Sequence, residues 1–127
     1  MVLDTSALVA VLSDEPERAA FIRLIADAKD PLISAATLLE ASIVVQARTG
    51  TTEDLDALLR AAGVRCVAVD AAQALAARAA WSRYGKGRSP AGLNYGDCFS
   101  YALATTLDRP LLFKGDDFPQ TDVRSAA

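Results

Sequence analysis

The sequence predicts one α/β domain in which helices cover both faces of a mainly parallel sheet. Short apolar runs, such as Val2–Leu3 and Leu111–Phe113, alternate along the chain with longer stretches of helical periodicity. Strands that alternate with helices are typical of parallel sheets covered on both sides. The 127 residues are the length of one domain, and they contain no repeat, low-complexity segment or linker. We therefore assign residues 1–127 to a single domain.

The first half of the chain has clear helix boundaries. Thr5 and Ser6 supply capping hydroxyls for the first helix, and Ser34 can cap the third. Gly50 ends the third helix, because glycine adopts the left-handed conformation that closes many helices. Strands are predicted at 2–3 and 31–33, and helices at 7–12, 13–27, 35–48 and 51–62.

The second half repeats the alternation. Residues 66–69 are apolar and are predicted to form a buried strand. Asp70 and Gln73 have the spacing of a capping box before an alanine-rich helix. The glycine-rich stretch 85–92 is predicted to be a loop, and Asn94 caps the helix after it. Helices are predicted at 71–84 and 95–107, and a strand at 111–113.

Composition excludes several kinds of chemistry. The chain has no histidine, which removes histidine general acid–base catalysis and the Ser-His and Cys-His mechanisms. Its two cysteines, Cys66 and Cys98, fit neither a disulfide framework nor a zinc site and are expected to be free thiols. The net charge of −3 disfavours general nucleic-acid binding. RNA binding therefore requires cation-bound acids and clustered basic residues.

The sequence contains no signal-peptide pattern and no apolar run of the roughly 20 residues that a membrane span needs. We therefore expect a soluble cytoplasmic protein without a membrane partner.

Five acidic residues are candidates for one site. Asp4 ends the first strand, and Asp116 and Asp117 follow the last one, so parallel strands would bring them to the same edge. Asp97 lies in the first turn of a helix, and Glu40 interrupts an otherwise apolar run. Clustered carboxylates without histidine or cysteine favour Mg²⁺ or Mn²⁺. Such ions activate water and stabilise charge on a reacting phosphate.

Each acid also has a purely structural explanation. Asp4 fits a helix N-cap or a turn residue, and Glu40 fits a capping box with Thr37. Asp97 fits a first-turn acid that complements the helix dipole, and the pair after Gly115 fits an ordinary turn. The sequence alone leaves these alternatives open.

Several other residues are candidates for substrate binding. Lys86 and Arg88 lie in the glycine-rich loop near Trp81, where cations and rings suit phosphates and bases. A solvated loop is the simpler interpretation. Lys114 adjoins the acids and could neutralise them or contact phosphate, and Ser6 could orient a water molecule or a carboxylate.

Four stretches of the chain resemble PIN-domain proteins of the VapC toxin family, in order and with suitable spacing. They are Val-Leu-Asp-Thr-Ser-Ala-Leu at 2–8, Leu-Leu-Glu-Ala-Ser at 38–42, Gly-Leu-Asn-Tyr-Gly-Asp-Cys-Phe-Ser-Tyr-Ala-Leu-Ala at 92–104, and Pro-Leu-Leu-Phe-Lys-Gly-Asp-Asp-Phe at 110–118. The resemblance implies a three-layer α/β/α sandwich with a mainly parallel sheet of about five strands. It also implies a Mg²⁺- or Mn²⁺-dependent endoribonuclease, inhibited by a VapB-like antitoxin, that forms a homodimer.

By the same resemblance, Asp4, Glu40 and Asp97 match the three core metal-site acids, and either Asp116 or Asp117 matches the fourth. We expect Asp4 and Asp97 to hold the principal ion, and Glu40 and the fourth acid to complete the site through water or a second ion.

Two other functions compete with hydrolysis of RNA. One is a PIN-like module that binds RNA or protein without cutting it. The other is an aspartate-nucleophile phosphatase acting through Asp4, but such enzymes carry a second aspartate two residues later, where this chain has Ser6.

Overall fold

The computed structural model describes all residues 1–127 and contains four strands, six α-helices and one short 3₁₀ helix. None of the helices is both long enough and apolar enough to cross a membrane. The strands are β1 (Val2–Leu3), β2 (Leu32–Ser34), β3 (Arg65–Val67) and β4 (Leu111–Leu112), and the helices are α1 (Thr5–Leu12), α2 (Arg18–Asp27), α3 (Ala35–Thr49), α4 (Glu53–Ala61), α5 (Ala71–Tyr84), α6 (Tyr95–Thr106) and η1 (Phe118–Gln120).

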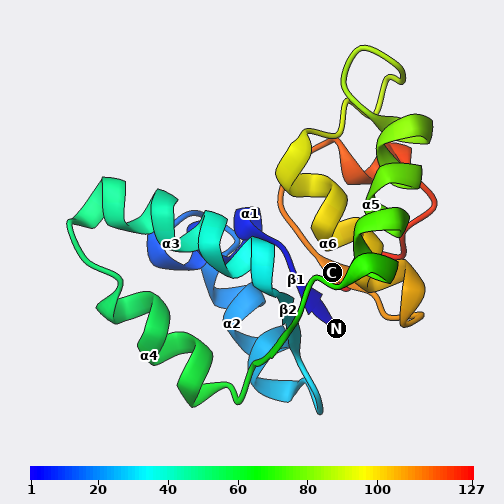
Figure 1. The fold of residues 1–127 in the computed structure, drawn as a ribbon. Helices are drawn as coiled ribbons and strands as arrows, with labels where there is room; N and C mark the ends of the chain where they lie inside the picture. Colours follow the sequence, from blue (N-terminus) through cyan, green and yellow to red (C-terminus); the bar gives the residue numbers. More distant parts are fainter.

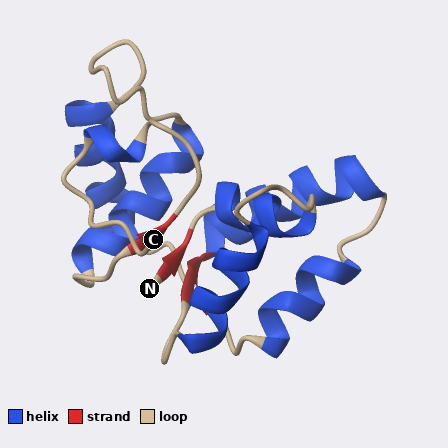
Figure 2. Ribbon diagram, turned by 180° about the vertical axis from the view of Figure 1, so that it is seen from behind, coloured by secondary structure: helices blue, strands red, loops and turns tan.

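The four strands form one parallel sheet in the order β3-β2-β1-β4. Figure 2 shows them as a small central layer with helices on both sides. The predicted α/β class and parallel sheet are confirmed, but the sheet has four strands rather than about five. The fifth position is filled by a single parallel bridge, in which Leu111 pairs with Ser125 beside β4. One bridge is too short to count as a strand.

Successive residues of each strand point to opposite faces, as the pleat of a strand requires. Val2, Leu32 and Leu111 are buried in one core with residues of α5 and α6. Their neighbours Leu3, Ile33 and Leu112 are buried in a second core with residues of α1 to α4. The chain is therefore a three-layer sandwich, and Figure 1 shows the two groups of helices on either side of β1 and β2.

Local capping signals predicted most helix ends correctly. Asp70 accepts a hydrogen bond from the Gln73 backbone N–H at 2.9 Å, so the predicted cap of α5 is confirmed. Asn94 caps α6 as predicted, and Gly50 ends α3 with a positive φ of 82°. Asp4 is the N-cap of α1, which confirms the structural explanation given for this residue, whereas the prediction that Thr5 and Ser6 cap this helix is wrong.

Two other predictions are wrong. The strand predicted to be buried at 66–69 is the edge strand β3, in which Arg65 and Cys66 are exposed. It pairs only with β2, so an apolar run here did not imply burial on both sides. Helix α2 begins at Arg18 rather than at 13, because residue Asp14 has a φ of 53° that no helix allows. Both cysteines are free thiols, as predicted.

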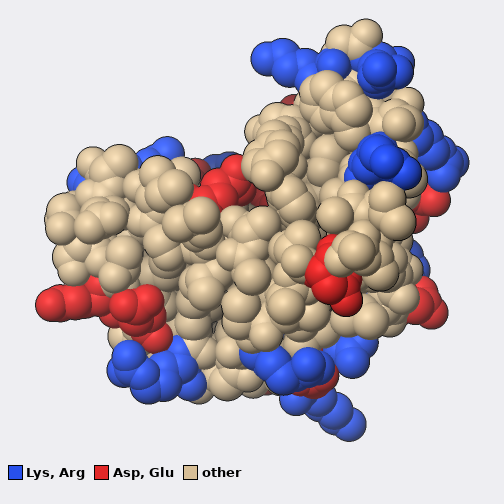
Figure 3. Space-filling view, in the orientation of Figure 1, with Lys and Arg blue, Asp and Glu red and all other residues tan.

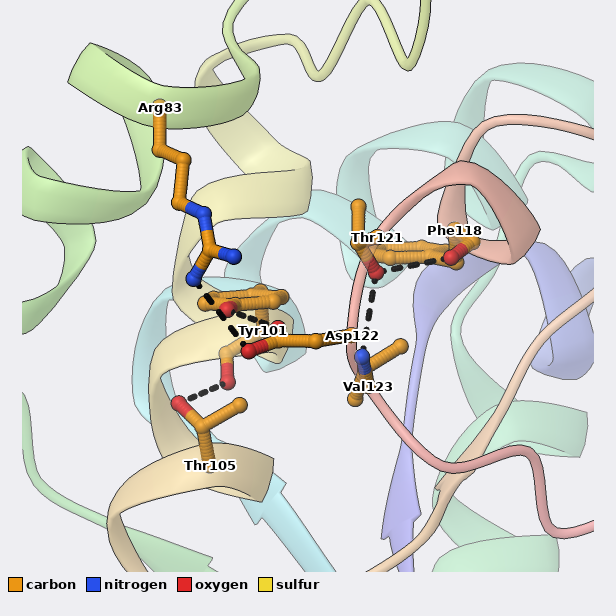
Figure 4. A network of polar contacts seen from close by, with 7 residues as sticks. All are labelled: Arg83, Tyr101, Thr105, Phe118, Thr121, Asp122 and Val123. Atoms are coloured by element: carbon orange, nitrogen blue, oxygen red, sulfur yellow. Dashed lines mark hydrogen bonds and ion pairs between the residues drawn. The ribbon is translucent and has the colours of Figure 1, made fainter.

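The segment after β4 is fastened to the helical layer of α5 and α6. Figure 4 shows Asp122 accepting hydrogen bonds from the Tyr101 hydroxyl on α6 and, at 3.3 Å, from Arg83 on α5. Thr121 donates to the Phe118 carbonyl at 2.7 Å and accepts from the Val123 N–H at 3.2 Å. These contacts hold the chain immediately after Asp116 and Asp117.

Candidate active site

Asp4 is a buried carboxylate held by neutral donors. It follows β1 directly, and only 3% of its surface is exposed. Its Oδ2 atom accepts hydrogen bonds from the Ser6 N–H at 3.0 Å and the Ser6 hydroxyl at 2.6 Å. Its Oδ1 atom accepts from the Ser100 hydroxyl at 2.6 Å. No Lys or Arg forms an ion pair with Asp4, so its orientation is fixed while its charge is not neutralised.

A buried pair of hydroxyls connects the elements that carry the acids. The Ser100 Oγ atom lies 3.1 Å from the Thr37 Oγ1 atom, and both residues are buried. Thr37 on α3 lies one turn before Glu40, and Ser100 on α6 lies one turn after Asp97. Hydrogen bonds through these two hydroxyls therefore connect α3 and α6 to the Asp4 carboxylate at the end of β1.

Glu40 does not form the capping box that its spacing with Thr37 allowed. Helix α3 has Ser34 as its N-cap, and Thr37 lies inside the helix and contacts Ser100 instead. The capping explanation for Glu40 is therefore wrong. The Glu40 Oε1 atom accepts a hydrogen bond from the Thr5 hydroxyl at 2.5 Å, which turns the carboxylate toward the end of β1.

Gly96 leaves the space that Glu40 occupies. A Cβ atom added at Gly96 would lie 2.0 Å from the Glu40 Oε2 atom, so only glycine permits this approach. Sequence reasoning did not identify Gly96, Thr5, Thr37 or Ser100 as parts of the site. A glycine in the first turn of α6 was the available signal, because glycine weakens a helix unless something approaches its backbone.

Asp97 is both a helix cap and a wall of the site. Its Oδ2 atom accepts from the Asn94 N–H at 3.0 Å, and its own N–H donates to Asn94 Oδ1 at 2.9 Å. Burial raises the pKa of Asp97 to about 6, although the hydrogen bond from Asn94 opposes this; the negative charges of Asp4, Asp117 and Glu40 raise it further. The structural explanation for Asp97 holds, and it does not exclude a functional one.

The two acids after β4 lie at the same edge of the sheet. The Asp4 N–H donates to the Leu112 carbonyl at 3.0 Å, so the ends of β1 and β4 are adjacent. Asp116 and Asp117 follow a turn at Gly115 and are exposed. Only Asp117 of the two contributes to the raised pKa of Asp97.

All five candidate acids line two adjoining cavities. The larger, of about 480 Å³, is lined by Asp4, Glu40 and Asp97 among others. The smaller, of about 200 Å³, is lined by Asp4, Asp97, Asp116 and Asp117 among others. Figure 3 shows acidic side chains in the notch between the two helical layers. Acids from four separate stretches of sequence thus share one recess.

The basic residues near this recess are engaged elsewhere. Lys114 lines both cavities, but its Nζ atom lies 2.5 Å from Glu15 Oε2 and 3.1 Å from Glu17 Oε2. These two partners raise the pKa of Lys114. Arg48, which sequence reasoning missed, also lines the larger cavity and donates to the Ser13 hydroxyl at 3.2 Å. Neither cation forms an ion pair with the candidate acids.

The other predicted binding residues divide into two groups. Ser6 lies in the recess, where its hydroxyl donates to Asp4 and accepts from the Lys114 N–H at 3.0 Å. Lys86 and Arg88 are exposed on the loop after α5 and do not line either acidic cavity. Figure 3 shows basic side chains gathered on this loop.

The donors in the recess suit a hard divalent cation. The candidate ligand atoms are the carboxylate oxygens of the five acids. Mg²⁺ commonly binds one or two carboxylates while keeping several waters. No group of three or more Asp, Glu or Cys side chains could hold a metal ion as it stands. Asp4 and Asp97 line both cavities, whereas Glu40 lines only the larger one and Asp116 and Asp117 line only the smaller one.

Comparison with known proteins identifies the family. The PIN domain family matches residues 1–124. The ribonuclease VapC30 of Mycobacterium tuberculosis (strain ATCC 25618 / H37Rv) is 54% identical over 129 aligned residues, which cover 100% of this chain and 98% of that protein. The chain belongs to the VapC family of PIN-domain ribonucleases. A VapC ribonuclease of Mycolicibacterium smegmatis is 55% identical, over 97% of each chain.

Two solved structures have the same fold at low sequence identity. VapC20 of M. tuberculosis, described as a sarcin-ricin loop cleaving toxin, has a TM-score of 0.69 and 20% identity and covers 97% of this VapC chain and 98% of its own. A toxin–antitoxin complex from Klebsiella pneumoniae has a TM-score of 0.71 and 19% identity, covering 95% of this chain and 92% of its own. The predicted family, fold class and function as a VapC ribonuclease toxin are confirmed.

The raised pKa of Asp97 makes the stability of this VapC chain depend on pH when divalent ions are absent. The pKa is about 6 in the folded chain, against an ordinary aspartate value of 3.8, so the folded chain binds more protons than the unfolded chain between these values. The Asp97 carboxyl therefore contributes a decrease in the free energy of unfolding as pH rises from about 4 to about 6, whereas the lowered pKa values of Glu17 and Asp30 act in the opposite direction. In urea unfolding in EDTA, the free energy of unfolding of the unmodified protein should therefore fall relative to that of Asp97→Asn over this pH range. An identical pH dependence in both proteins would contradict the assignment.

Proposed function

We propose that this VapC chain hydrolyses RNA phosphodiesters with a Mg²⁺ or Mn²⁺ ion bound by Asp4 and Asp97, as the toxin of a VapBC-type pair. The observation that supports this most strongly is the recess itself. It brings together acids from four stretches of the chain and contains no cation that pairs with them. Carboxylates placed so close repel one another, and a divalent cation relieves that repulsion.

The neighbouring residues prepare the acids for this role. When bound, the ion supplies activated water and positive charge for the reacting phosphate. Ser6 and Ser100 hold Asp4 in one orientation, since both donate hydrogen bonds to its oxygens. Asp97 keeps a proton at a higher pH than an exposed aspartate and releases it when a cation approaches its oxygens.

Glu40 and one acid of the β4 turn would complete the site through water or a second ion. Thr5 and Gly96 fix the Glu40 carboxylate at the wall of the larger cavity. Asp117 is better placed than Asp116 for the fourth position, because its charge acts on Asp97.

The predicted substrate-binding residues receive different roles. We assign Ser6 to positioning Asp4, since its hydroxyl is already engaged there. Lys114 contacts phosphate only if it leaves Glu15 and Glu17. Lys86 and Arg88 lie outside both acidic cavities, on the exposed loop after α5, and would contact neighbouring parts of the RNA.

A VapB-like antitoxin and a second copy of the chain are the proposed protein partners, and the cytoplasm is the proposed location. One protein with the same fold was solved as a toxin–antitoxin complex. The acidic recess would accept an arginine side chain from an antitoxin, because its carboxylates have no paired cation.

The competing functions are less compatible with the site. A phosphatase of this kind carries a second aspartate two residues after the nucleophile, whereas this chain has Ser6 there, with its hydroxyl engaged by Asp4 and by the Lys114 N–H. Labelled RNA incubated with and without Mg²⁺ and EDTA separates the functions. Metal-dependent cutting supports the nuclease, binding without cutting supports the module, and an acyl phosphate supports the phosphatase.

Asp4→Asn and Asp97→Asn should each lower Mg²⁺-dependent RNA cleavage at least about 100-fold, because several kcal/mol of transition-state stabilisation depend on the ion that they hold. Both variants should stay folded, since asparagine retains an oxygen that can accept the hydrogen bonds of Ser100 or Asn94. Cleavage is measured by gel and folding by circular dichroism. Asp54→Asn, an exposed position on α4, is the matched control. Full activity in either site variant would refute the assignment.

The two acids after Gly115 should differ in effect. Asp117→Asn should weaken Mg²⁺-dependent cleavage about 10-fold or more, as loss of an outer partner of a metal site usually does. Asp116→Asn, the neighbouring position, should change the rate less, because Asp117 is the acid of this turn whose charge raises the pKa of Asp97. Rates are compared at several Mg²⁺ concentrations. The opposite order would assign the fourth acid to Asp116.

A further inference from the structure

A second recess adjoins the acidic cavities and has a different lining. It lies between α5 and α6, has a volume of about 600 Å³, and is lined by nine residues of which six are hydrophobic. Three of them are aromatic: Trp81, Tyr95 and Phe99. Asn94 lines this aromatic pocket and both acidic cavities, so this residue borders both sites.

The rings of the aromatic pocket are held in place. A Cβ atom added at Gly85 would lie 2.6 Å from Trp81 Cδ2, so the backbone of Gly85 lies directly against the indole ring. The Gly85 N–H also donates to the Trp81 carbonyl at 2.8 Å. Tyr95 meets Phe99 edge to face, with ring centroids 4.9 Å apart. Tyr95 is nevertheless 79% exposed, which leaves most of its ring available to a ligand.

The pocket also has two cations without partners. Arg78 on α5 and Lys86 on the following loop line it, and neither forms an ion pair with any acid of the chain. Aromatic rings beside uncompensated cations are complementary to a ligand that combines a flat ring with a negative charge.

We propose that the aromatic pocket binds a nucleobase of the RNA strand next to the phosphate that lies in the acidic recess. The proposal rests on the nuclease function proposed above, and it adds a base-binding subsite to it. The base stacks on Trp81 or Tyr95, while Arg78 and Lys86 contact the flanking phosphates. Proteins that read unpaired RNA commonly stack its bases on aromatic side chains in this way. The pocket therefore contributes to the choice of cleavage site.

The chain offers a direct probe, because Trp81 is its only tryptophan. The full-length protein is titrated in Mg²⁺, within a time that is short compared with cleavage, with a mixed-sequence RNA oligonucleotide and with an abasic oligonucleotide of the same length and charge. We expect the RNA to quench Trp81 fluorescence, and the abasic strand to bind at least about fivefold more weakly, which is the smallest loss typical of one base–aromatic stack.

Two variants separate the pocket from general charge effects. Tyr95→Ala should weaken RNA binding at least about fivefold and leave folding intact, since this side chain is mostly exposed. Leu75→Ala is the matched control, because Leu75 is also an exposed apolar residue but does not line the pocket. Its binding should equal that of the unmodified protein.

Equal binding of RNA and abasic strand would overturn the proposal, as would Trp81 fluorescence that does not respond to RNA. An unresponsive Trp81 together with a change in oligomeric mass for Tyr95→Ala would assign the pocket to a second copy of the chain instead. The titration needs no cleavage, so it can fail while Asp4→Asn still abolishes Mg²⁺-dependent hydrolysis. Conversely, base-dependent quenching in a protein that does not cut RNA would refute only the nuclease function.

Discussion

Mutual repulsion among carboxylates at one edge of the sheet is the constraint on which the structure of the site depends. The pKa of Asp97 is raised by the negative charges of Asp4, Glu40 and Asp117. No lysine or arginine forms an ion pair with any of these four acids. A fold that only needed stability would place a cation here or spread the acids apart. Repulsion among the carboxylates therefore destabilises the metal-free protein, and a divalent ion that enters the recess relieves it.

The fold keeps these charges together by using neutral hydrogen-bond donors. Hydroxyl groups of Ser6 and Ser100 hold Asp4, and Thr5 holds Glu40. Such donors orient a carboxylate without cancelling the charge that attracts a metal ion. Nearby Lys114 is occupied by two other acids, which leaves the recess negative. The parallel register of β1 and β4 then brings the remaining acids to the same edge.

Features that depend on neighbouring residues could be predicted from the sequence. The caps formed by Asp70 and Asn94 involve groups only three residues apart. The alternation of predicted strands and helices along the chain was enough to predict the layered α/β fold. Features that depend on distant residues could not. Cys66 lies in an apolar run whether β3 is central or at the edge, and only the strand order shows that it is at the edge.

The candidate site shows the same division. Residue type and strand ends located the acids, but nothing local distinguishes a capping Glu40 from one that faces Thr5 across 35 positions of sequence. The contact of Ser100 with Asp4 spans 96 positions, and the approach of Glu40 to Gly96 exists only after α3 and α6 pack together. The family resemblance identified the acids but not these supporting residues, because the supporting residues position the acids and would not themselves bind the metal ion.

The most direct test is to titrate metal-free protein with Mn²⁺ and to follow the electron paramagnetic resonance signal of the free ion. If the acids share a divalent cation, the free signal should be suppressed until at least one ion is bound per chain. Replacing both Asp4 and Asp97 with asparagine should restore it. Mn²⁺ that stays free in the presence of the folded, unmodified protein, at concentrations that support RNA cleavage, would show that these carboxylates do not form a metal site.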